Sequence, residues 1–485
     1  MAYIMGDRHQ MTFLPPSIEE YVSEDDPVRA YDTFVESLDF NQLGITIDEC
    51  KAGAQAYYPK SLLKLLLYGY AYGIRSSRKL ERAAKHNLAF IWLTGDLQPD
   101  YRTIARFRKN NHTALKKVLT QCVHMCIKLD LIDGNRLFVD GTKIKANASL
   151  VRTWTKERCE RYLTEITKNI DSLLAECERV DQEEETTGSL VQMKDNLRNK
   201  ETMAAAIKDI LTELEESKKT YTNTTDDDSV KAKSDRGTKM YHNAQVTVDG
   251  KHGLIVSNAS VHQSNDSNQL SNQVEQAQAV LGKAPEVACA DSGYFSVADL
   301  KKIPAETTVI VPSQQQAQGK NSPQFRNPFH KAAFCYDAEA DEYRCPAGNR
   351  LHAIPHTIFN RDETVSYQAK GEDCTHCAFF GRCTRSSSGR TIVRLKDEVV
   401  KEQLEARYSS AEGQATYKQR KEKAELPFAY IKHTLGIRQF LLRRKRGVDT
   451  ELALVATCYN VTRMISLIGG IGAFMARLAV PPVPG

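Results

Sequence analysis

The chain has 485 residues and a mass of 54.5 kDa, which is too long for one ordinary domain and predicts about two to four folding units. Hydrophobic content of 41%, charged content of 26% and a mean hydropathy of -0.47 exclude fibrous and disordered classes and argue against a membrane protein. A net charge of +5 is too small to indicate nucleic acid binding unless the basic residues cluster locally.

Two segments bear on where the chain works, and they predict a cytoplasmic protein that does not span a membrane. The first ten residues include Asp7 and Arg8 and contain no apolar core segment, so we expect no signal peptide. The longest apolar run, near residues 464–480, is interrupted by glycines and by Arg477 and predicts a buried terminal helix. We therefore expect the 12 cysteines to be reduced, and functional cysteines to be metal ligands rather than disulfides.

Residues 1–134 predict a helical domain. An apolar segment around residues 61–70 has helical spacing, and basic residues follow it at the same spacing. A second basic segment covers residues 101–108. The two segments indicate either a surface that faces DNA phosphates or two solvated helix faces. The candidates for DNA contact are Arg75, Arg78, Arg102, Arg106 and Arg108.

A short apolar strand at residues 137–139 begins a different kind of region. It ends at Asp140 and is followed by Gly141 and a polar run. Residues 152–220 then become strongly charged, with apolar residues at steps of three and four on both sides of a polar break. This pattern predicts an antiparallel helical hairpin, which we expect to be a structural or dimerising arm without chemistry of its own.

Further strands follow the predicted hairpin. The runs 244–248 and 254–256 flank an Asp-Gly turn and predict two antiparallel strands, with a helix over about 267–281. Residues 287–290 predict a buried strand that ends at Asp291, and residues 308–311 predict another. The order of elements indicates an α/β fold with a sheet of mixed strand directions, whose first part is residues 135–312.

The segment 313–395 is polar and rich in glycine and cysteine, and it predicts a separate module inserted into the α/β fold. Two of its cysteines have the spacing of a metal knuckle, and two more can complete a tetrahedral four-cysteine zinc site. Such a zinc would be structural, because four thiolates leave no open coordination position. The alternative is a small β-rich module with free thiols. The candidate ligands are Cys345, Cys374, Cys377 and Cys383, with His376 or Cys335 as substitutes.

Residues 396–485 predict the second part of the α/β fold. One long helical stretch is expected over about 397–434, with Glu425 and Lys432 about two turns apart on one face. Pro427 lies inside this stretch and indicates a kink or a helix start. A last helix is expected from about residue 450 onward.

Asp140, Asp291 and Glu425 are candidate ligands of divalent metal ions. The two aspartates each follow a buried strand, and sites in open α/β sheets lie at the edge where such strands end. Carboxylate oxygens suit Mg²⁺ or Mn²⁺, and a third acid from a helix on the sheet would complete a two-metal site for phosphodiester chemistry. Taken singly, each acid also fits a helix cap, a turn or an exposed helix face.

Several sequence blocks occur together in an order typical of one known family. They are residues 58–64, 68–78, 103–108, 139–147, 253–256, 290–295, 425–432 and 456–460. Through these blocks, nearly the whole chain resembles bacterial insertion-sequence transposases with an RNase H-like DDE catalytic domain. Each block alone is a weak signal, and their joint occurrence carries the resemblance.

The resemblance implies a role for each candidate in the α/β region. The metal-binding DDE triad would be Asp140, Asp291 and Glu425. The family signature around the glutamate would be formed by Tyr417, Arg420 and Lys432. The usual pattern has three residues between the arginine and the glutamate, whereas four separate Arg420 from Glu425, and Lys421 occupies the expected place.

The densest basic cluster of the chain follows the glutamate. Close to a phosphodiester site, its members are candidates for contacts that position the DNA backbone without reading its sequence. The alternative is a solvated helix end. The members are Arg438, Arg443, Arg444, Lys445 and Arg446.

The resemblance implies a transposase that cuts double-stranded DNA at the terminal inverted repeats of its element and joins the freed ends to target DNA. The N-terminal helices would bind the repeats. Because two DNA ends must be brought together, we expect at least a homodimer. The alternatives are a nuclease of the same fold and a DNA-binding descendant of a transposase that has no catalytic activity.

Overall fold

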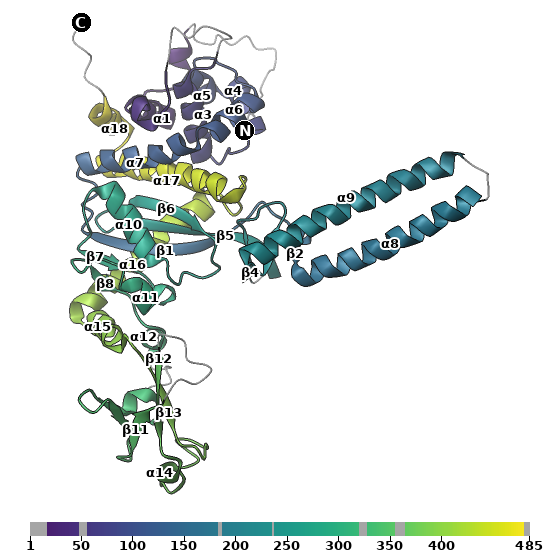
Figure 1. The fold of residues 1–485 in the computed structure, drawn as a ribbon. Coiled ribbons are helices and arrows are strands. Elements are labelled where there is room, and N and C mark those ends of the chain that lie inside the picture. Colours follow the sequence, from purple (N-terminus) through teal and green to yellow (C-terminus); the bar gives the residue numbers. More distant parts are fainter. Residues whose placement is uncertain are drawn as a thin grey trace, which may run out of the picture.

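The computed structural model describes residues 17–47, 56–182, 187–234, 237–319, 327–354 and 364–479. The first ten residues, on which the expectation of a cytoplasmic location partly rested, lie outside these ranges. N-terminal helices lie at one end of the molecule and a small β-rich module at the other, with a central sheet between them (Figure 1). A long pair of helices projects sideways from the sheet.

The N-terminal helices form where apolar residues recur at helical spacing. The first residue of α3 is Pro59, which needs no amide partner there, and Leu63, Leu65 and Leu66 on this helix are fully buried. The helices expected in this region are therefore present. They are α1 (Pro27–Glu36), α2 (Phe40–Leu43), α3 (Pro59–Ala71), α4 (Ser77–His86), α5 (Leu88–Thr94), α6 (Tyr101–Asn110) and α7 (His112–Lys128), after a 3₁₀ helix at Ile18–Tyr21.

The central sheet contains both antiparallel and parallel strand pairs. Its order is β4-β5-β1-β7-β8, and β6 pairs with β5. Strand β5 is antiparallel to β1, whereas β7 is parallel to β1 and β8 is parallel to β7. The mixed α/β prediction is confirmed. The strands are β1 (Arg136–Lys145), β4 (Val230–Ser234), β5 (Gly237–Asp249), β6 (Ile255–Val261), β7 (Val287–Cys289) and β8 (Thr308–Ile310).

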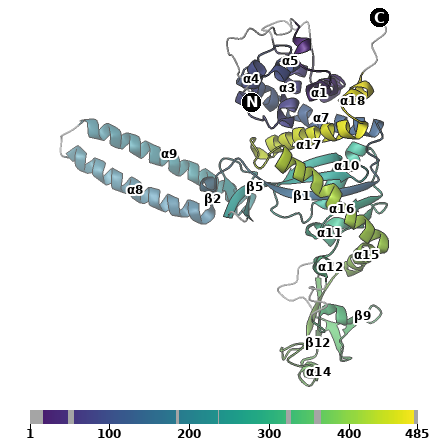
Figure 2. The same ribbon diagram turned by 180° about the vertical axis from the view of Figure 1, so that it is seen from behind.

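Helices cover both faces of this sheet. Helix α10 (Leu270–Leu281) lies on one face and α16 (Ala411–Ala429) on the other, as the two opposite views show (Figures 1 and 2). Helix α17 (Arg444–Ile468) separates the sheet from the N-terminal helices and ends before α18 (Ile471–Leu478). One apolar core runs from the N-terminal helices through α17 to the sheet.

Helix α17 is long and apolar enough, by length and composition, to cross a membrane. Within the described ranges it is the only helix with this property, and 67% of its most apolar 18-residue window is buried inside the protein. It therefore has the burial of a core helix. The prediction of a buried terminal helix near residues 464–480 is met by the end of α17 and by α18, in which Met464 and Phe474 are fully buried.

The projecting arm consists of α8 (Lys156–Gln182) and α9 (Thr187–Ser217). Apolar side chains at helical spacing, including the buried Cys159, Ile166 and Ile207, form the seam between the two helices near the sheet. The strands β2 (Thr153–Thr155) and β3 (Tyr221–Asn223) pair at the base of the arm.

The cysteine-containing module is built on a second, antiparallel sheet. Its order is β13-β12-β11-β10-β9. The elements are β9 (Cys335–Asp337), β10 (Glu342–Arg344), β11 (Arg350–Ala353), β12 (Thr364–Ala369), α14 (Gly371–Thr375) and β13 (Thr391–Leu395). Helix α12 (Gln314–Gln318) precedes the module, and α15 (Glu398–Ser409) follows it and packs near β8.

Three predicted boundaries are wrong, and the first two lie in β1 and before α16. Strand β1 does not end at Asp140 but continues to Lys145, because Ile144 enters a second apolar cluster and the polar run pairs with β5. The helical stretch expected over 397–434 is broken at Ser410, whose extended backbone lets its hydroxyl accept a hydrogen bond from the Gly413 amide and start α16.

The end of α16 also differs from a regular helix. Pro427 lies in its last turn, and a π-helical turn at Tyr430–Thr434 follows directly. Proline removes an amide donor from the helix ladder, so the regular pattern is lost near this point. The last long helix begins at Arg444 rather than near residue 450, so the basic run supplies its first turn.

Candidate active site

Asp140 lies within β1, between a buried apolar half and a more polar half of the strand. It pairs with Val246 of β5, and its side chain is 15% exposed. A Cβ on the next residue, Gly141, would lie 2.3 Å from the Gln245 amide nitrogen and 2.6 Å from an Asp266 carboxylate oxygen, so a larger residue here would displace these side chains. The strand thus presents Asp140 at a place where other polar groups approach the backbone closely.

Asp291 follows β7, the parallel neighbour of β1. Its carboxylate oxygen Oδ1 accepts a hydrogen bond of 2.8 Å from the Gly293 amide, which caps a short 3₁₀ helix at Ser292–Tyr294. Because β1 and β7 are adjacent and parallel, their aspartates come to the same region of the sheet. The two carboxylates are close enough for Asp291 to raise the pKa of Asp140.

Glu425 reaches the same region from α16, which packs across β1. The Arg420 guanidinium, one and a half turns earlier, lies 3.6 Å from the Asp140 carboxylate and 3.8 Å from the Glu425 carboxylate. Arg420 is 13% exposed, whereas Glu425 is 50% exposed. Arg420 therefore bridges two acids of the predicted triad despite its shifted spacing, and Lys421 at the expected place is exposed to solvent.

Lys432 and Tyr417 complete the residues predicted around Glu425. The Lys432 ammonium group donates a hydrogen bond to the Thr142 hydroxyl on β1. Burial lowers the pKa of Lys432, and the nearby Asp140 opposes this effect. The Tyr417 ring packs edge-on against Tyr408, and the Arg420 guanidinium lies 5.7 Å from its centroid. Tyr417 thus holds Arg420 by packing.

The electrostatics of Asp140 are unusual for a carboxylate. Burial raises its pKa to about 7, and the charges of Asp291 and Asp266 act in the same direction. Arg420 lowers the pKa but does not cancel the effect. One Arg420 nitrogen, Nη1, is buried without a hydrogen-bond partner. The site therefore carries an excess of carboxylate charge that neighbouring donors leave incompletely neutralised.

Asp266 is a fourth acid at the site that the sequence analysis missed. It lies between β6 and α10, and its Oδ1 accepts hydrogen bonds from the Asn243 amide group at 2.8 Å and the Gln245 amide group at 2.7 Å. The buried Tyr294 hydroxyl donates in turn to Gln245. The sequence signal was weak, because Asp266 follows no strand directly. The available signal was the pair of amide side chains, Asn243 and Gln245, on alternate residues of β5, because both donate to Asp266.

The donor chemistry at this site fits a hard divalent cation. Asp291 and Asp266 lie close enough to Asp140 to raise its pKa, and the buried Asp140 would gain most from a positive charge beside it. Across the described ranges, no three His, Cys, Asp or Glu side chains converge closely enough to hold a metal ion as they stand. Binding would therefore require the acids to draw closer together.

Comparison with protein families finds similarity to transposases in two parts of the chain. One family model, described as a transposase domain (DUF772), matches residues 16–110, and another, described as a transposase DDE domain, matches residues 344–465. The two matches support an insertion-sequence DDE transposase. The second match includes Glu425, Arg420 and Lys432 but neither Asp140 nor Asp291. Comparisons with curated proteins and with solved structures gave no match.

Two arginines predicted to face DNA point into the transposase instead. Arg75 donates to the Glu451 carboxylate at 2.6 Å and to the Gln439 carbonyl at 3.0 Å. Arg108 is 8% exposed and donates to the Tyr70 hydroxyl and the Arg75 carbonyl. The prediction for this pair is wrong, because Arg75 ties the N-terminal helices to α17 and Arg108 ties α6 to α3. Helical spacing alone could not distinguish this inward orientation.

Most of the other basic candidates are exposed, and some line a groove between α6, α7 and the start of α17. Lys445 is an exception, because its ammonium group binds the Asp449 carboxylate at 2.9 Å and the Ser260 carbonyl at 2.6 Å. The groove includes Lys109, Arg443 and Arg446 and joins two regions far apart in the sequence. The exposed candidates are Arg78, Arg102, Arg106, Arg438, Arg443, Arg444 and Arg446.

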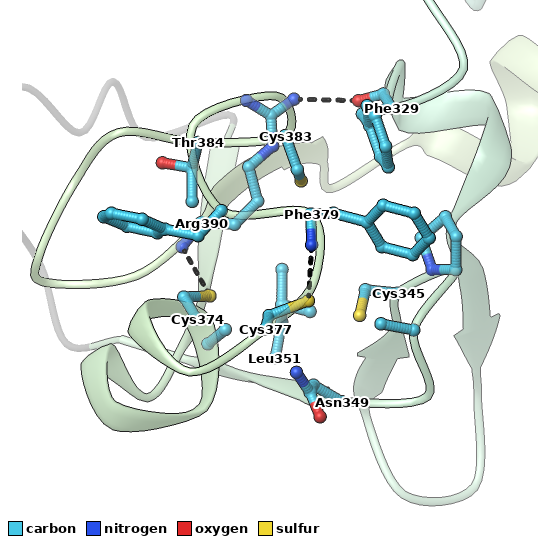
Figure 3. A pocket seen from close by; sticks show the side chains of 14 residues that line it. Phe329, Cys345, Asn349, Leu351, Cys374, Cys377, Phe379, Cys383, Thr384 and Arg390 are labelled. Atoms are coloured by element: carbon cyan, nitrogen blue, oxygen red, sulfur yellow. Dashed lines mark hydrogen bonds between the residues drawn. The ribbon is translucent and has the colours of Figure 1, made fainter.

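The four predicted zinc ligands line one small pocket of the cysteine module (Figure 3). Cys345 follows β10, Cys374 lies in α14, and Cys377 and Cys383 lie in the segment before β13. Burial raises the pKa of the Cys383 thiol, Arg390 opposes this, and the other three cysteines add to the rise. Neither substitute, His376 or Cys335, lines this pocket.

Proposed function

We propose that this transposase cleaves DNA at the ends of its insertion sequence and joins the freed ends to target DNA, using an RNase H-like core. The observation that carries the proposal is the position of Arg420 between Asp140 and Glu425, near Asp291, which follows the adjacent strand β7. Three acids that are far apart in the sequence thus lie near one arginine. The sheet order around β1 supports the RNase H-like core that the resemblance implies.

Asp140, Asp291 and Glu425 would hold Mg²⁺ or Mn²⁺. The bound metal would supply the positive charge that aligns an attacking oxygen and stabilises the oxygens of the phosphodiester in the transition state. Asp140 must lose the proton on its carboxyl oxygen to act as a ligand, since burial raises its pKa to about 7. Arg420 helps to retain the resulting negative charge inside the site.

Lys432 is suited to bind the DNA backbone near the reacting phosphate. Its ammonium group is anchored on β1 through the Thr142 hydroxyl and can shift to a phosphate oxygen without leaving the site. The exposed arginines of the groove, such as Arg443 and Arg446, would bind phosphates further along the duplex. The N-terminal helices would bind the terminal repeats, and a homodimer acting in the cytoplasm would bring two ends together.

The decisive experiment measures strand cleavage of a labelled duplex that carries the terminal repeats of the element. The wild type is compared with Glu425→Gln in Mg²⁺, and with Glu422→Gln as a matched control, because Glu422 lies on the same helix and is 78% exposed. We expect cleavage at the repeat boundary by the wild type and by the control. Glu425→Gln should cut at least about 10²-fold more slowly, the size of loss that follows removal of a transition-state electrostatic group.

The same assay separates the alternatives. Cutting without transfer to a target duplex would favour a nuclease of the same fold. If all three proteins shift the duplex on a gel and none cuts it in Mg²⁺ or Mn²⁺, the chain is a DNA-binding descendant without catalysis. Equal cleavage rates for Glu425→Gln and the wild type would show that Glu425 is not a ligand of the catalytic metal.

A further inference from the structure

The cysteine module has a very small apolar core for a folded unit. Its buried cluster consists of a few side chains from the five-stranded sheet, among them Tyr343, Leu351 and Tyr367, together with Cys374. Units of this size rarely bury enough apolar surface to fold stably by packing alone, and a metal or disulfide usually supplements the core. The module therefore needs a cross-link, and its cysteines are the groups that could provide one.

The four thiols come from three places in the module, since Cys374 and Cys377 share one turn, and they surround a single space. They line a pocket of about 20 Å³. Figure 3 shows Cys345, Cys374, Cys377 and Cys383 around it. A space of this size holds about one water molecule or one ion. The pocket thus matches a single small occupant with sulfur atoms around it.

The backbone around the pocket is arranged to stabilise thiolates. The Phe379 amide donates to the Cys377 sulfur at 3.5 Å, and the Arg390 amide donates to the Cys374 sulfur at 3.4 Å. The Gly348 amide donates to the Cys345 carbonyl at 2.8 Å and closes a tight turn after that cysteine. Amide donors aimed at sulfur favour the charged form of the ligand.

Arg390 supplies a second, independent observation. Its side chain lines the pocket, one of its terminal nitrogens donates to the Phe329 carbonyl at 3.2 Å, and its Nε is buried without a hydrogen-bond partner. A buried guanidinium donor that stays unsatisfied is costly beside neutral thiols. It is explained if the pocket holds a negatively charged group, and a divalent ion bound by four thiolates carries a net charge of about −2.

We propose that Cys345, Cys374, Cys377 and Cys383 bind one structural zinc ion, and that Cys335 and His376 do not take part. Cys335 is exposed on β9 and lies opposite Arg344 rather than at the pocket. His376 Nδ1 lies 2.9 Å from the Glu372 carbonyl, and the ring lines a neighbouring surface pocket. Four thiolates close the coordination shell, so the ion would stabilise the module and would not react with DNA.

Zinc binding requires a local rearrangement. Zn–S bonds are about 2.3 Å long, and no three candidate ligand side chains in the described ranges converge that closely. Because each cysteine lies in a turn or at a helix end, changes in side-chain torsions can bring the sulfurs toward the centre of the pocket. The binding energy would then also order the module.

The test measures the metal content of the purified full-length chain without DNA, so its result is independent of the proposed DNA chemistry. We expect about one zinc per chain in the wild type, in Cys335→Ser, in His376→Ala and in Glu425→Gln. Cys377→Ser and Cys383→Ser should lose most of it. A wild type that binds no zinc after reduction and zinc addition would overturn the proposal. Loss of zinc from Cys335→Ser or His376→Ala would overturn the ligand assignment.

Variants of Cys377 or Cys383 can fail to fold, so a second measurement uses the wild type alone. Cobalt exchanged into the site should give the thiolate charge-transfer band and the strong visible bands of a tetrahedral ion with four sulfur ligands. A spectrum of an ion with mixed nitrogen and sulfur ligands would contradict the assignment. A disulfide between Cys374 and Cys377, found by mass spectrometry in metal-free protein purified without reductant, would overturn the proposal, because the cross-link would then be covalent.

Discussion

Two buried carboxylates, Asp140 in the active site and Asp449 at the start of α17, have similar burial but opposite electrostatics. Asp449 is 8% exposed and receives hydrogen bonds from the Ser260 amide and hydroxyl and from the Lys445 and Lys116 ammonium groups. Although burial alone would raise its pKa, these partners lower it. Asp140 is 15% exposed and has Arg420 at 3.6 Å, and its pKa is raised to about 7.

The difference distinguishes structural charges from functional ones. Glu451 is fully buried and accepts hydrogen bonds from Arg75 and from the Leu441 and Leu442 amides, so the charges around α17 are satisfied within the protein. The charges around Asp140 are left for a ligand to neutralise. Buried acids whose charge the fold does not compensate are expected at catalytic sites. The predictions that follow test this contrast.

Glu451→Gln should cause the largest loss of stability among these variants. The change keeps the side-chain volume but leaves the Arg75 guanidinium inside the protein without a counter-charge. We expect the free energy of unfolding to fall by about 3–5 kcal/mol, as when one partner of a buried ion pair is removed. Chemical denaturation of the two proteins measures this difference.

The matched control is Glu215→Gln, whose pair with Lys156 on the arm is more than half exposed on both sides. That variant should change the free energy of unfolding by less than about 1 kcal/mol. If both variants lose the same small amount, the junction at α17 does not depend on its buried charges.

Asp140→Asn should raise the free energy of unfolding at neutral pH, whereas Glu451→Gln lowers it. The unfolded chain has an ordinary aspartate pKa of 3.8, whereas burial raises the folded value to about 7, so wild-type stability falls as the pH rises from about 4 to 7. Asparagine carries no charge at any of these values. We therefore expect the variant to be more stable than the wild type above pH 7, by up to about 4 kcal/mol.

Thermal unfolding in EDTA at pH 4 and pH 8 checks this expectation. The advantage of Asp140→Asn should vanish at pH 4 and should shrink at pH 8 when Mg²⁺ is added to the wild type. The same variant should not cut DNA. An Asp140→Asn protein that is less stable than the wild type at pH 8 would show that the fold does compensate this charge.

Asp449→Asn should lose stability at neutral pH, by about 1–3 kcal/mol, because hydrogen bonds to a charged acceptor become bonds to a neutral one. The pKa of Asp449 is lowered in the folded protein, so the wild-type advantage is present above pH 3.8 and is lost as the pH falls further. Unfolding measured at pH 7 and at pH 3 checks this sign. If the stability loss in Asp449→Asn persists unchanged at pH 3, its cause is a packing defect rather than the lost charge.

The sequence was sufficient for features that depend on local pattern. Apolar runs predicted β7 with Asp291 after it, and helical spacing predicted both helices of the arm. Prediction from the sequence failed where tertiary packing determines the orientation of a side chain. Arg75 and Arg78 belong to the same basic stretch, yet only Arg75 turns inward to Glu451. Asp266 is held near Asp140 by side-chain amides of β5, and no local spacing encodes that position.

Arg446→Ala should have the smallest effect and should leave stability unchanged, because Arg446 is exposed at the groove between α7 and α17. If it binds one DNA phosphate, the slope of log Kd against log salt concentration should decrease by about 0.9. Arg477→Ala on α18 is an exposed control expected to keep the full slope. The slope reports how many DNA phosphates the protein neutralises. If both variants keep the wild-type slope, Arg446 does not bind a phosphate and the groove loses its support as a DNA-binding surface.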